Sequence, residues 1–442
     1  MLKRFLASLL LLLLLSSPSQ AALEFATGTL NIGTGAATTT YSVTGKAPAT
    51  DAWKVVILWW GGRTETTDAV GETHIRPGIG VAVSATSRWA VTAQAEHGSG
   101  TTDTDRYHTS AAAVATLTIA GAVDLLADFV AFTADGFTLV IDDASAAALE
   151  VSYILLGGAD LTNAETGILT LDTGTGVDDY TGETTFTPDF AIFAGNQAAD
   201  PASAATNFRL SIGMATATAQ NVLAINSQHG AGDSDTTSYI YTGEIFAILG
   251  AADTASDRAS LSAFLADGFQ INKIEGVTAW RVHWLALKGG QYAIGDFLTA
   301  TDTNAFTEAH GMDVTPKGAM FFSANRAVST ADTPTAVLEW SVGASDGTIN
   351  TAHYVREKDA AGTSDAFVAV SHDQVYLNAD NSTTQVLEGE GHVNSIDGTN
   401  ITLQMSDADP AQSFVRYVAF GSNAGAPPAG CTQYQNLMGV GC

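Results

Sequence analysis

The most constraining feature of this sequence is an internal repeat with a period close to 130 residues. Three apolar runs, each rich in β-branched and aromatic residues and closed by glycine, occupy 149–158, 277–290 and 413–421. Matching residues recur at intervals of 130 or 132: Gly157, Gly289 and Gly421; Asp105, Asp235 and Asp365; Gly136, Gly268 and Gly398. Solenoid repeats are only about 20–50 residues long, so this period indicates tandem copies of a whole domain.

The pattern within each copy predicts β-structure. Thr, Val, Ala and Gly dominate, and an Asp-Gly pair precedes an alternating run, which is typical of a hairpin. Short strands separated by such turns predict an all-β fold of three tandem antiparallel β-sandwiches, jelly-roll or lectin-like, each able to bury its own core. Residues 253–265 and 111–126 are the segments where a short helix is expected.

The repeat divides the chain into five parts. A signal peptide is expected at 1–22, followed by sandwiches at 23–158, 163–290 and 291–423 and a Gly/Pro linker with a cysteine-containing tail at 424–442. Aligning the closing runs places His283 at the position of Val151 and Val415, on the inward face. At such a position we expect a hydrogen-bonded core histidine.

The first residues are typical of a secretory signal. Lys3 and Arg4 precede an apolar run at 5–15, too short to span a bilayer, and small residues follow it up to Ala21 and Ala22. We expect cleavage near these alanines and a secreted or extracellular protein, on a virion or a cell surface. A retained membrane anchor is the alternative.

The two cysteines, Cys431 and Cys442, both lie in the tail. In an exported protein a local disulfide between them is expected. Pairing between the tails of two chains remains the alternative.

The formal net charge of −28 excludes several classes of partner. Nucleic acid and anionic lipid are both bound through basic surfaces, so neither is expected as a ligand, and no membrane contact is expected after signal cleavage. Acidity suits a salty medium or one with divalent cations, although it also simply favours solubility. The expected partners are further copies of the chain or other surface or virion proteins, with glycans as an additional candidate.

One acidic loop recurs in each copy and is the best candidate for a metal site. It holds Asp103 and Asp105 in the first copy and Asp233 and Asp235 in the second, whereas the third has one aspartate fewer and no histidine. Alternating aspartates beside glycines can offer oxygen ligands to calcium, but Ca²⁺ needs six or more. The simpler interpretation is a turn capped by Asp and Ser side chains. No other cofactor is expected.

No complete set of catalytic residues is recognisable. Asp172-Thr-Gly resembles half of an aspartic protease site, but the matching position at 302–304 breaks the pattern. The seven tryptophans include Trp59 and Trp60, which are adjacent and therefore point to opposite faces of a strand. One of these two is a candidate for an exposed sugar-stacking surface, while most of the tryptophans are expected in the core.

The strings at 53–65, 134–139 and 153–158 resemble a repeat of uncharacterised phage and environmental secreted proteins. There the repeat is similar to virion-associated or tail-fibre-type β-domains. The resemblance covers the three copies and its motifs are turns and strands, so it implies a structural role and no catalytic residues.

These observations predict a secreted, non-enzymatic structural or adhesive protein of a virion appendage, cell surface or extracellular assembly, for which glycans are one candidate ligand. Tandem copies supply length and multivalency, which help adhesion more than chemistry. The alternative is a secreted glycan-active enzyme, because a glycosidase needs only two carboxyl groups, and these can come from different strands.

Overall fold

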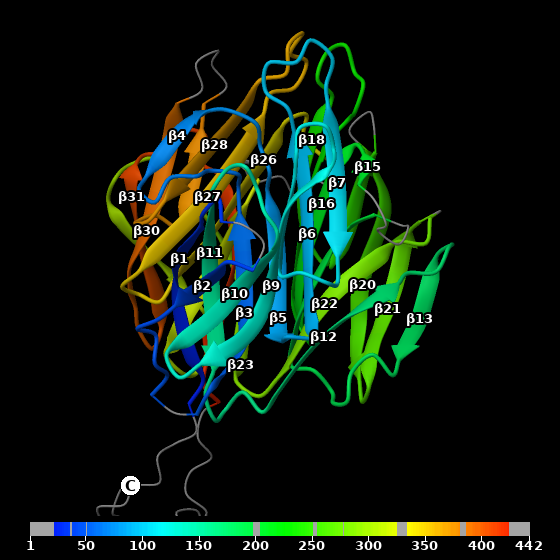
Figure 1. Ribbon diagram of the computed structural model, residues 1–442. Helices are drawn as coiled ribbons and strands as arrows, with labels where there is room; N and C mark the ends of the chain where they lie inside the picture. Colours follow the sequence, from blue (N-terminus) through cyan, green and yellow to red (C-terminus); the bar gives the residue numbers. More distant parts are fainter. Residues whose placement is uncertain are drawn as a thin grey trace, which may run out of the picture.

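The computed structural model describes residues 22–35, 38–49, 51–197, 204–250, 254–276, 278–324, 334–380 and 386–423. These residues form an all-β protein of antiparallel sheets (Figure 1). Across the same residues we find no helix with the length and apolar character needed to cross a bilayer.

The strands fall into three groups along the chain. The first group comprises β1 (Glu24–Ile32), β2 (Thr40–Val43), β3 (Trp53–Trp60), β4 (Ala69–Glu72), β5 (Gly78–Ser84), β6 (Ser87–Ala95), β7 (Thr104–Thr109), β8 (Val114–Leu117), β9 (Val123–Thr133), β10 (Gly136–Asp143) and β11 (Leu149–Gly157). The second comprises β12 (Asn163–Thr170), β13 (Gly176–Thr181), β14 (Phe190–Gln197), β15 (Ala205–Thr206), β16 (Phe208–Thr216), β17 (Gln220–Ser227), β18 (Thr236–Thr242), β19 (Phe246–Gly250), β20 (Thr254–Leu265), β21 (Gly268–Glu275) and β22 (Arg281–Lys288). The third comprises β23 (Gln291–Leu298), β24 (Ala305–Ala309), β25 (Pro316–Ser323), β26 (Leu338–Ser345), β27 (Asn350–Glu357), β28 (Ala366–Ser371), β29 (Tyr376–Ala379), β30 (Leu387–Ile396), β31 (Asn400–Asp407) and β32 (Phe414–Gly421).

Each group builds a sandwich of one large inner sheet and one four-stranded outer sheet. The inner sheets run β1-β11-β3-β5-β6-β7, β12-β22-β14-β16-β17-β18 and β23-β32-β25-β26-β27-β28. The outer sheets run β2-β10-β9-β8, β13-β21-β20-β19 and β24-β31-β30-β29. In all three, the first strand lies beside the last, and the third strand lies beside the last on its other side, as in a jelly roll. The later strands of the inner sheet follow one another as a meander.

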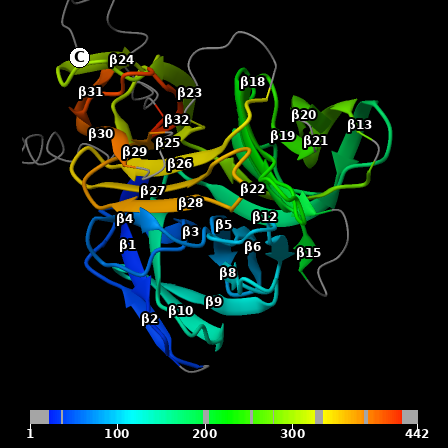
Figure 2. The ribbon, with the colours of Figure 1, turned by 90° about the horizontal axis from the view of Figure 1, so that it is seen from above.

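The three inner sheets face one another around a common axis, while the outer sheets lie on the outside (Figure 2). Strand β3 shows why. Val55, Ile57 and Trp59 enter a central core shared by all three groups, whereas Val56 and Trp60 enter the core of the first sandwich. Strands apolar on both faces must be covered on both faces. Each sandwich therefore has its own core and contributes to a second, common one.

The sheet edges are exchanged in a closed cycle. Strand β4 of the first group pairs with β28 of the third, and β15 of the second pairs with β7 of the first. Thr335 of the third group forms two backbone hydrogen bonds of 2.9 Å with Ser238 on β18 of the second. Each group thus covers the edge of its neighbour, and the heterologous contact closes into a pseudo-threefold ring.

The two ends of the described chain meet at one end of this ring. The backbone N–H of Leu23 donates to the Ser422 hydroxyl at 2.9 Å, and the Asn423 side chain donates to Asp160 at 2.7 Å. Figure 1 shows the start of β1 on this side, with the loops after β6, β17 and β27 at the opposite end.

Two sequence expectations are wrong at the level of single elements. Residues 254–265 form strand β20, and 114–117 form strand β8, so neither segment is helical. Both segments pair with a neighbouring strand, and these backbone bonds outweigh the helix preference of Ala and Leu.

The alignment of His283 is also wrong, by one residue. In each copy, an aromatic side chain of the closing strand packs against the glycine that pairs with it on the first strand. The pairs are Tyr153 with Gly28, Trp284 with Gly167 and Tyr417 with Gly295. A Cβ atom added to any of these glycines would lie within 2.7 Å of the aromatic side chain, so only glycine fits there. His283 precedes the aromatic residue and therefore corresponds to Ser152 and Arg416. A shift of one residue reverses the face, so His283 points away from its own sandwich core. It is buried and hydrogen-bonds His108.

Candidate functional site

The loops proposed to bind calcium meet at the end of the ring opposite the termini (Figure 1). They interlock through one hydroxyl per copy. Ser364 Oγ donates to the Glu96 carbonyl at 2.6 Å and accepts the Ser99 N–H at 3.0 Å. Equivalent pairs of bonds are made by Thr102 with Gln228 and Ala231, and by Ser234 with Lys358 and Ala361. The loops therefore act as a clasp between neighbouring copies.

A second contact explains the residue change in the third loop. His97 Nδ1 accepts the N–H of Ala366 at 3.0 Å, and His229 Nδ1 lies 3.2 Å from the N–H of Thr104. At the third boundary, Asp359 Oδ1 accepts the N–H of Thr236 at 2.9 Å. A neutral imidazole nitrogen and a carboxylate oxygen are both acceptors, so the histidine and the aspartate perform the same task.

The four aspartates of these loops are spread over different environments. Asp105 is buried, accepts a bond from Gln94 at 2.9 Å, and has a pKa raised by its burial. Asp103 lies 3.5 Å from His229. Asp233 lies beside Gly362 of the third loop, and the backbone carbonyl of Asp235 accepts the N–H of Gln228. Among the residues that the structure describes, no group of three or more His, Cys, Asp or Glu is placed to hold a metal ion. Calcium binding here stays a proposal.

Two other sequence expectations have different outcomes. Cys431, Cys442 and residues 1–21 of the expected signal peptide lie outside the described residues. The expectation that either Trp59 or Trp60 is exposed is wrong. Both are fully buried, and the other five tryptophans are also at least 95% buried. The inner sheets are covered on both faces, so opposite-facing side chains of one strand both enter a core.

A cluster of titratable side chains lies at the boundary between the first and third copies. His372 is held between two carboxylates of the first copy, with Nδ1 3.1 Å from Asp68 and Nε2 3.1 Å from Glu150. Glu150 is buried and also accepts a bond from Asn31. The hydrogen bond that His372 donates to Glu150, with the one it donates to Asp68, raises the pKa of His372 despite partial burial.

A pocket of about 390 Å³ opens beside this cluster, with two carboxyl groups in its lining, Asp68 and Glu390. The pKa of Glu390 is raised by partial burial and by the negative charges of Asp407, Asp373 and Asp68. A carboxyl group whose pKa is raised is the type of group that general acid catalysis uses. Val70 and Val386 are exposed in the same lining and give the pocket apolar walls.

The sequence contains no signal for this pocket. Asp68, Glu150, His372 and Glu390 are up to 322 positions apart and belong to no motif. The pairing of β4 with β28 brings Asp68 to the third sandwich, and this pairing requires the three copies to close into a ring.

Comparisons with known proteins identify no family. No family model and no curated protein matches the chain. Among solved structures, a fructofuranosidase from Schwanniomyces occidentalis complexed with fructose aligns over 86% of this chain and 98% of its own, at 6% identity. Its TM-score of 0.14 is too low to carry an argument about fold or function.

Proposed function

We propose that this chain is a secreted, non-enzymatic structural or adhesive protein of a virion appendage, cell surface or extracellular assembly. The closed ring is the observation that supports this role best. Three sandwiches that share a core and exchange edge strands form one structural unit, so the chain resembles a trimer made within a single polypeptide.

The positions of the two ends support the same role. The two ends of the described chain, Leu23 and Asn423, lie at one end and the interlocked loops lie at the other, so a tether attached there would hold the loop end outward. An element that displays one end to its surroundings needs this polarity. The acidic charge of −28 favours protein or glycan partners over nucleic acid or anionic lipid.

The test combines light scattering and negative-stain imaging of residues 22–442 with retention on an array of polysaccharides and surface glycans. Discrete oligomers, filaments or retention on the array would agree with a structural or adhesive role. A protein that stays monomeric at high concentration and is retained on no surface would contradict it.

A glycan-active enzyme is the second candidate, because Asp68 and Glu390 line one pocket and the pKa of Glu390 is raised. A glycosidase requires two carboxyl groups, one as general acid and the other as base or nucleophile. Release of reducing ends from mixed polysaccharides that disappears in Glu390→Gln, but persists in the exposed control Glu72→Gln, would favour the enzyme and reject the non-enzymatic role. No release by the wild-type protein would remove this candidate.

A further inference from the structure

The pseudo-threefold ring allows each boundary between copies to be compared with the other two. In every closing strand, the residue before the aromatic side chain lies on the face turned toward the neighbouring copy: Ser152, His283 and Arg416. Ser152 lies 2.5 Å from the Thr351 hydroxyl, whereas His283 Nε2 lies 2.7 Å from His108 Nδ1. Equivalent positions therefore hold a hydroxyl, an imidazole and a guanidinium, which respond differently to acid.

A pair of buried histidines joins the second copy to the first. His108 and His283 are both 1% exposed, and the ring of Trp89 lies against His283 with 5.5 Å between the ring centroids. His283 Nδ1 has no hydrogen-bond partner. Two neutral imidazoles satisfy this contact with one shared hydrogen bond, so an added proton brings a charge into a buried site.

The positive charges around the pair also oppose a proton. Arg281 lies two residues before His283 on β22. Burial lowers the pKa of His283 well below its ordinary value, and the charges of His108 and Arg281 add to the effect. Arg106 on β7 and Arg209 on β16 bring two further positive charges to this boundary.

The carboxyl groups of this boundary lie near the loop clasp, around His229. Asp103 is 3.5 Å from His229, and Asp105 is bonded to Gln94. His229 Nδ1 lies 3.2 Å from both the N–H and the carbonyl oxygen of Thr104, so this histidine keeps a partner when it is protonated. The acid response of the boundary is therefore expected from the buried pair rather than from the clasp.

The boundary between the first and third copies combines opposite effects. His353 is fully buried there, neither of its ring nitrogens has a partner, and burial lowers its pKa to about 3. His97, whose Nδ1 accepts a backbone N–H in the clasp, loses that bond on protonation. Against these losses, His372 lies between Asp68 and Glu150, and its raised pKa means that both ion pairs strengthen as the pH falls.

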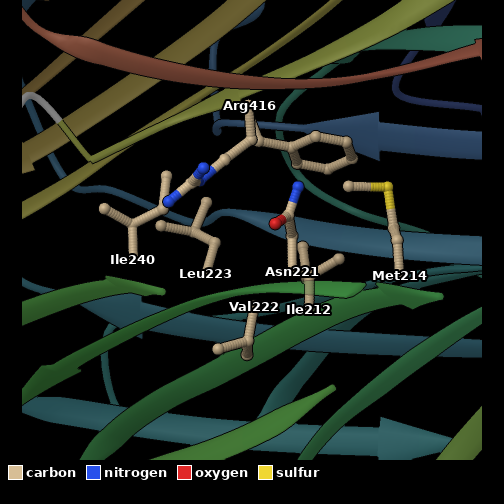
Figure 3. A pocket seen from close by; sticks show the side chains of 8 residues that line it. Ile212, Met214, Asn221, Val222, Leu223, Ile240 and Arg416 are labelled. Carbon is tan, nitrogen blue, oxygen red and sulfur yellow. The ribbon is translucent and has the colours of Figure 1, made fainter. Parts of the chain in front are cut away.

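The boundary between the second and third copies is held by a group that does not titrate in this range. Figure 3 shows Arg416 among apolar side chains of the second copy. Burial lowers the pKa of Arg416 to about 10, so it stays charged at neutral and acid pH, where it bonds Asp296 at 2.5 Å. Asp296 and Asn221 also line an open cleft of about 390 Å³ at this boundary. Within the described residues, every histidine that bonds across a boundary does so at a boundary of the first copy.

We propose that the boundary between the first and second copies is an acid-sensitive joint, which opens when the His108–His283 pair takes up a proton while the second and third copies stay joined. The closed ring excludes a proton that an exposed histidine accepts with a pKa of about 6.5. Opening is therefore favoured as the pH falls below about 6.5, and the closed form is fully stable above it. The second and third copies keep the backbone bonds between Ser238 and Thr335 and the hydroxyl contact of Ser234, none of which titrates. This response to acid goes beyond the structural role proposed above.

The test is hydrogen exchange with peptide-level mass spectrometry on residues 22–442 at pH 7.5 and pH 5.0, with times scaled to the intrinsic exchange rate at each pH. Peptides covering β7 and β15 report on the boundary between the first and second copies, and peptides covering β18 and Thr335 report on the one between the second and third. His108→Gln combined with His283→Gln keeps a donor and an acceptor on each side chain but removes the titration. His353→Gln makes the same change at a buried histidine of another boundary and is the matched control.

At pH 5.0 we expect the protection of β7 and β15 to fall about thirtyfold in the wild-type protein and in His353→Gln, the factor for one histidine that stays neutral only in the closed ring. Strand β18 and Thr335 should keep their protection, and the double variant should show no acid response at either boundary. Unchanged protection of β7 and β15, or an equal loss at both boundaries, would overturn the proposal in the wild-type protein alone, whether or not the double variant folds. An acid response that persists in a folded double variant would overturn the assignment to this pair.

Discussion

Replacing Glu357 by Gln is expected to stabilise the folded protein by about 3 kcal/mol near pH 8.5 and to leave its stability almost unchanged near pH 4.5. Glu357 ends β27 inside the ring and is fully buried. The residue that ends β17 is Ser227, and the one that ends β6 is Ala95. Only one copy therefore places a carboxyl group at this level of the central structure.

The expected magnitude follows from the surroundings of that carboxyl. Burial raises its pKa from 4.5 to about 7, and the negative charges of Asp359 and Asp365 add to the effect, while Ser227 opposes it. Neither carboxyl oxygen has a partner in hydrogen-bond geometry. The folded state therefore holds the proton more tightly than the unfolded chain, and stability falls as the pH rises from about 4.5 through 7. A shift of 2.5 units corresponds to about 3 kcal/mol, which Gln does not lose because it carries no charge.

The assay is denaturant or thermal unfolding of wild type and Glu357→Gln across this pH range. For a chain of this size, a difference of 3 kcal/mol appears as a rise in Tm of about 4 °C. Comparing the two proteins at each pH cancels the titration of all other groups. The Glu72→Gln substitution makes the same chemical change at an exposed position of β4 and serves as the control. A stability difference that is the same at both ends of the pH range would refute the reasoning.

Four further outcomes are expected. Ser364→Ala removes two bonds of the loop clasp and should lower the unfolding free energy by about 1–3 kcal/mol in denaturant titration; an unchanged value would mean that the clasp adds no stability. His372→Gln should cost more stability near pH 6 than near pH 8.5, because the raised pKa of His372 means that its contribution is complete at low pH and is lost as the pH rises; equal costs would contradict this. Residues 22–290 alone should not give a cooperative melting transition, since truncation exposes the shared core, and a sharp transition would argue for independent sandwiches. Excess EDTA should leave Tm unchanged, because Asp105 is occupied by Gln94; a fall would support calcium in the loops.

The sequence was sufficient to predict the all-β character of the fold, because turns and alternating strands are local signals. The shared core was missed, although β3 carried the evidence for it: from Val55 to Trp60 every residue is apolar, as expected of a strand covered on both faces. The error at His283 has a simple physical origin. The alignment was based on the glycine that ends each closing strand. The structural equivalence is instead set by the aromatic residue that pairs with the glycine of the first strand, and this aromatic residue is displaced by one position in the second copy.

The pocket at the first and third copies and the cleft at the second and third could not be predicted. Asp68 and Glu390 line the same pocket, and Asn221 and Asp296 line the same cleft, only because the copies surround one axis. Sequence spacing reports which residues share a strand or a turn. It carries no information on which copies become neighbours in a ring, since that is decided by packing of the inner sheets.

The cyclic exchange of sheet edges also dictates the order in which this protein can mature. Strand β4 is synthesised early but pairs with β28, so Ala69 cannot pair until Val370, about 300 residues later in the chain, has been synthesised. Pairing across such separations gives a high contact order, and closing such large loops makes folding slow. Strand β4 therefore stays unpaired, and the inner apolar face of the first sandwich stays open, until the last sandwich has left the ribosome. A nascent chain in this condition needs protection from aggregation for the whole of its translation, and it becomes resistant to proteases in one late step.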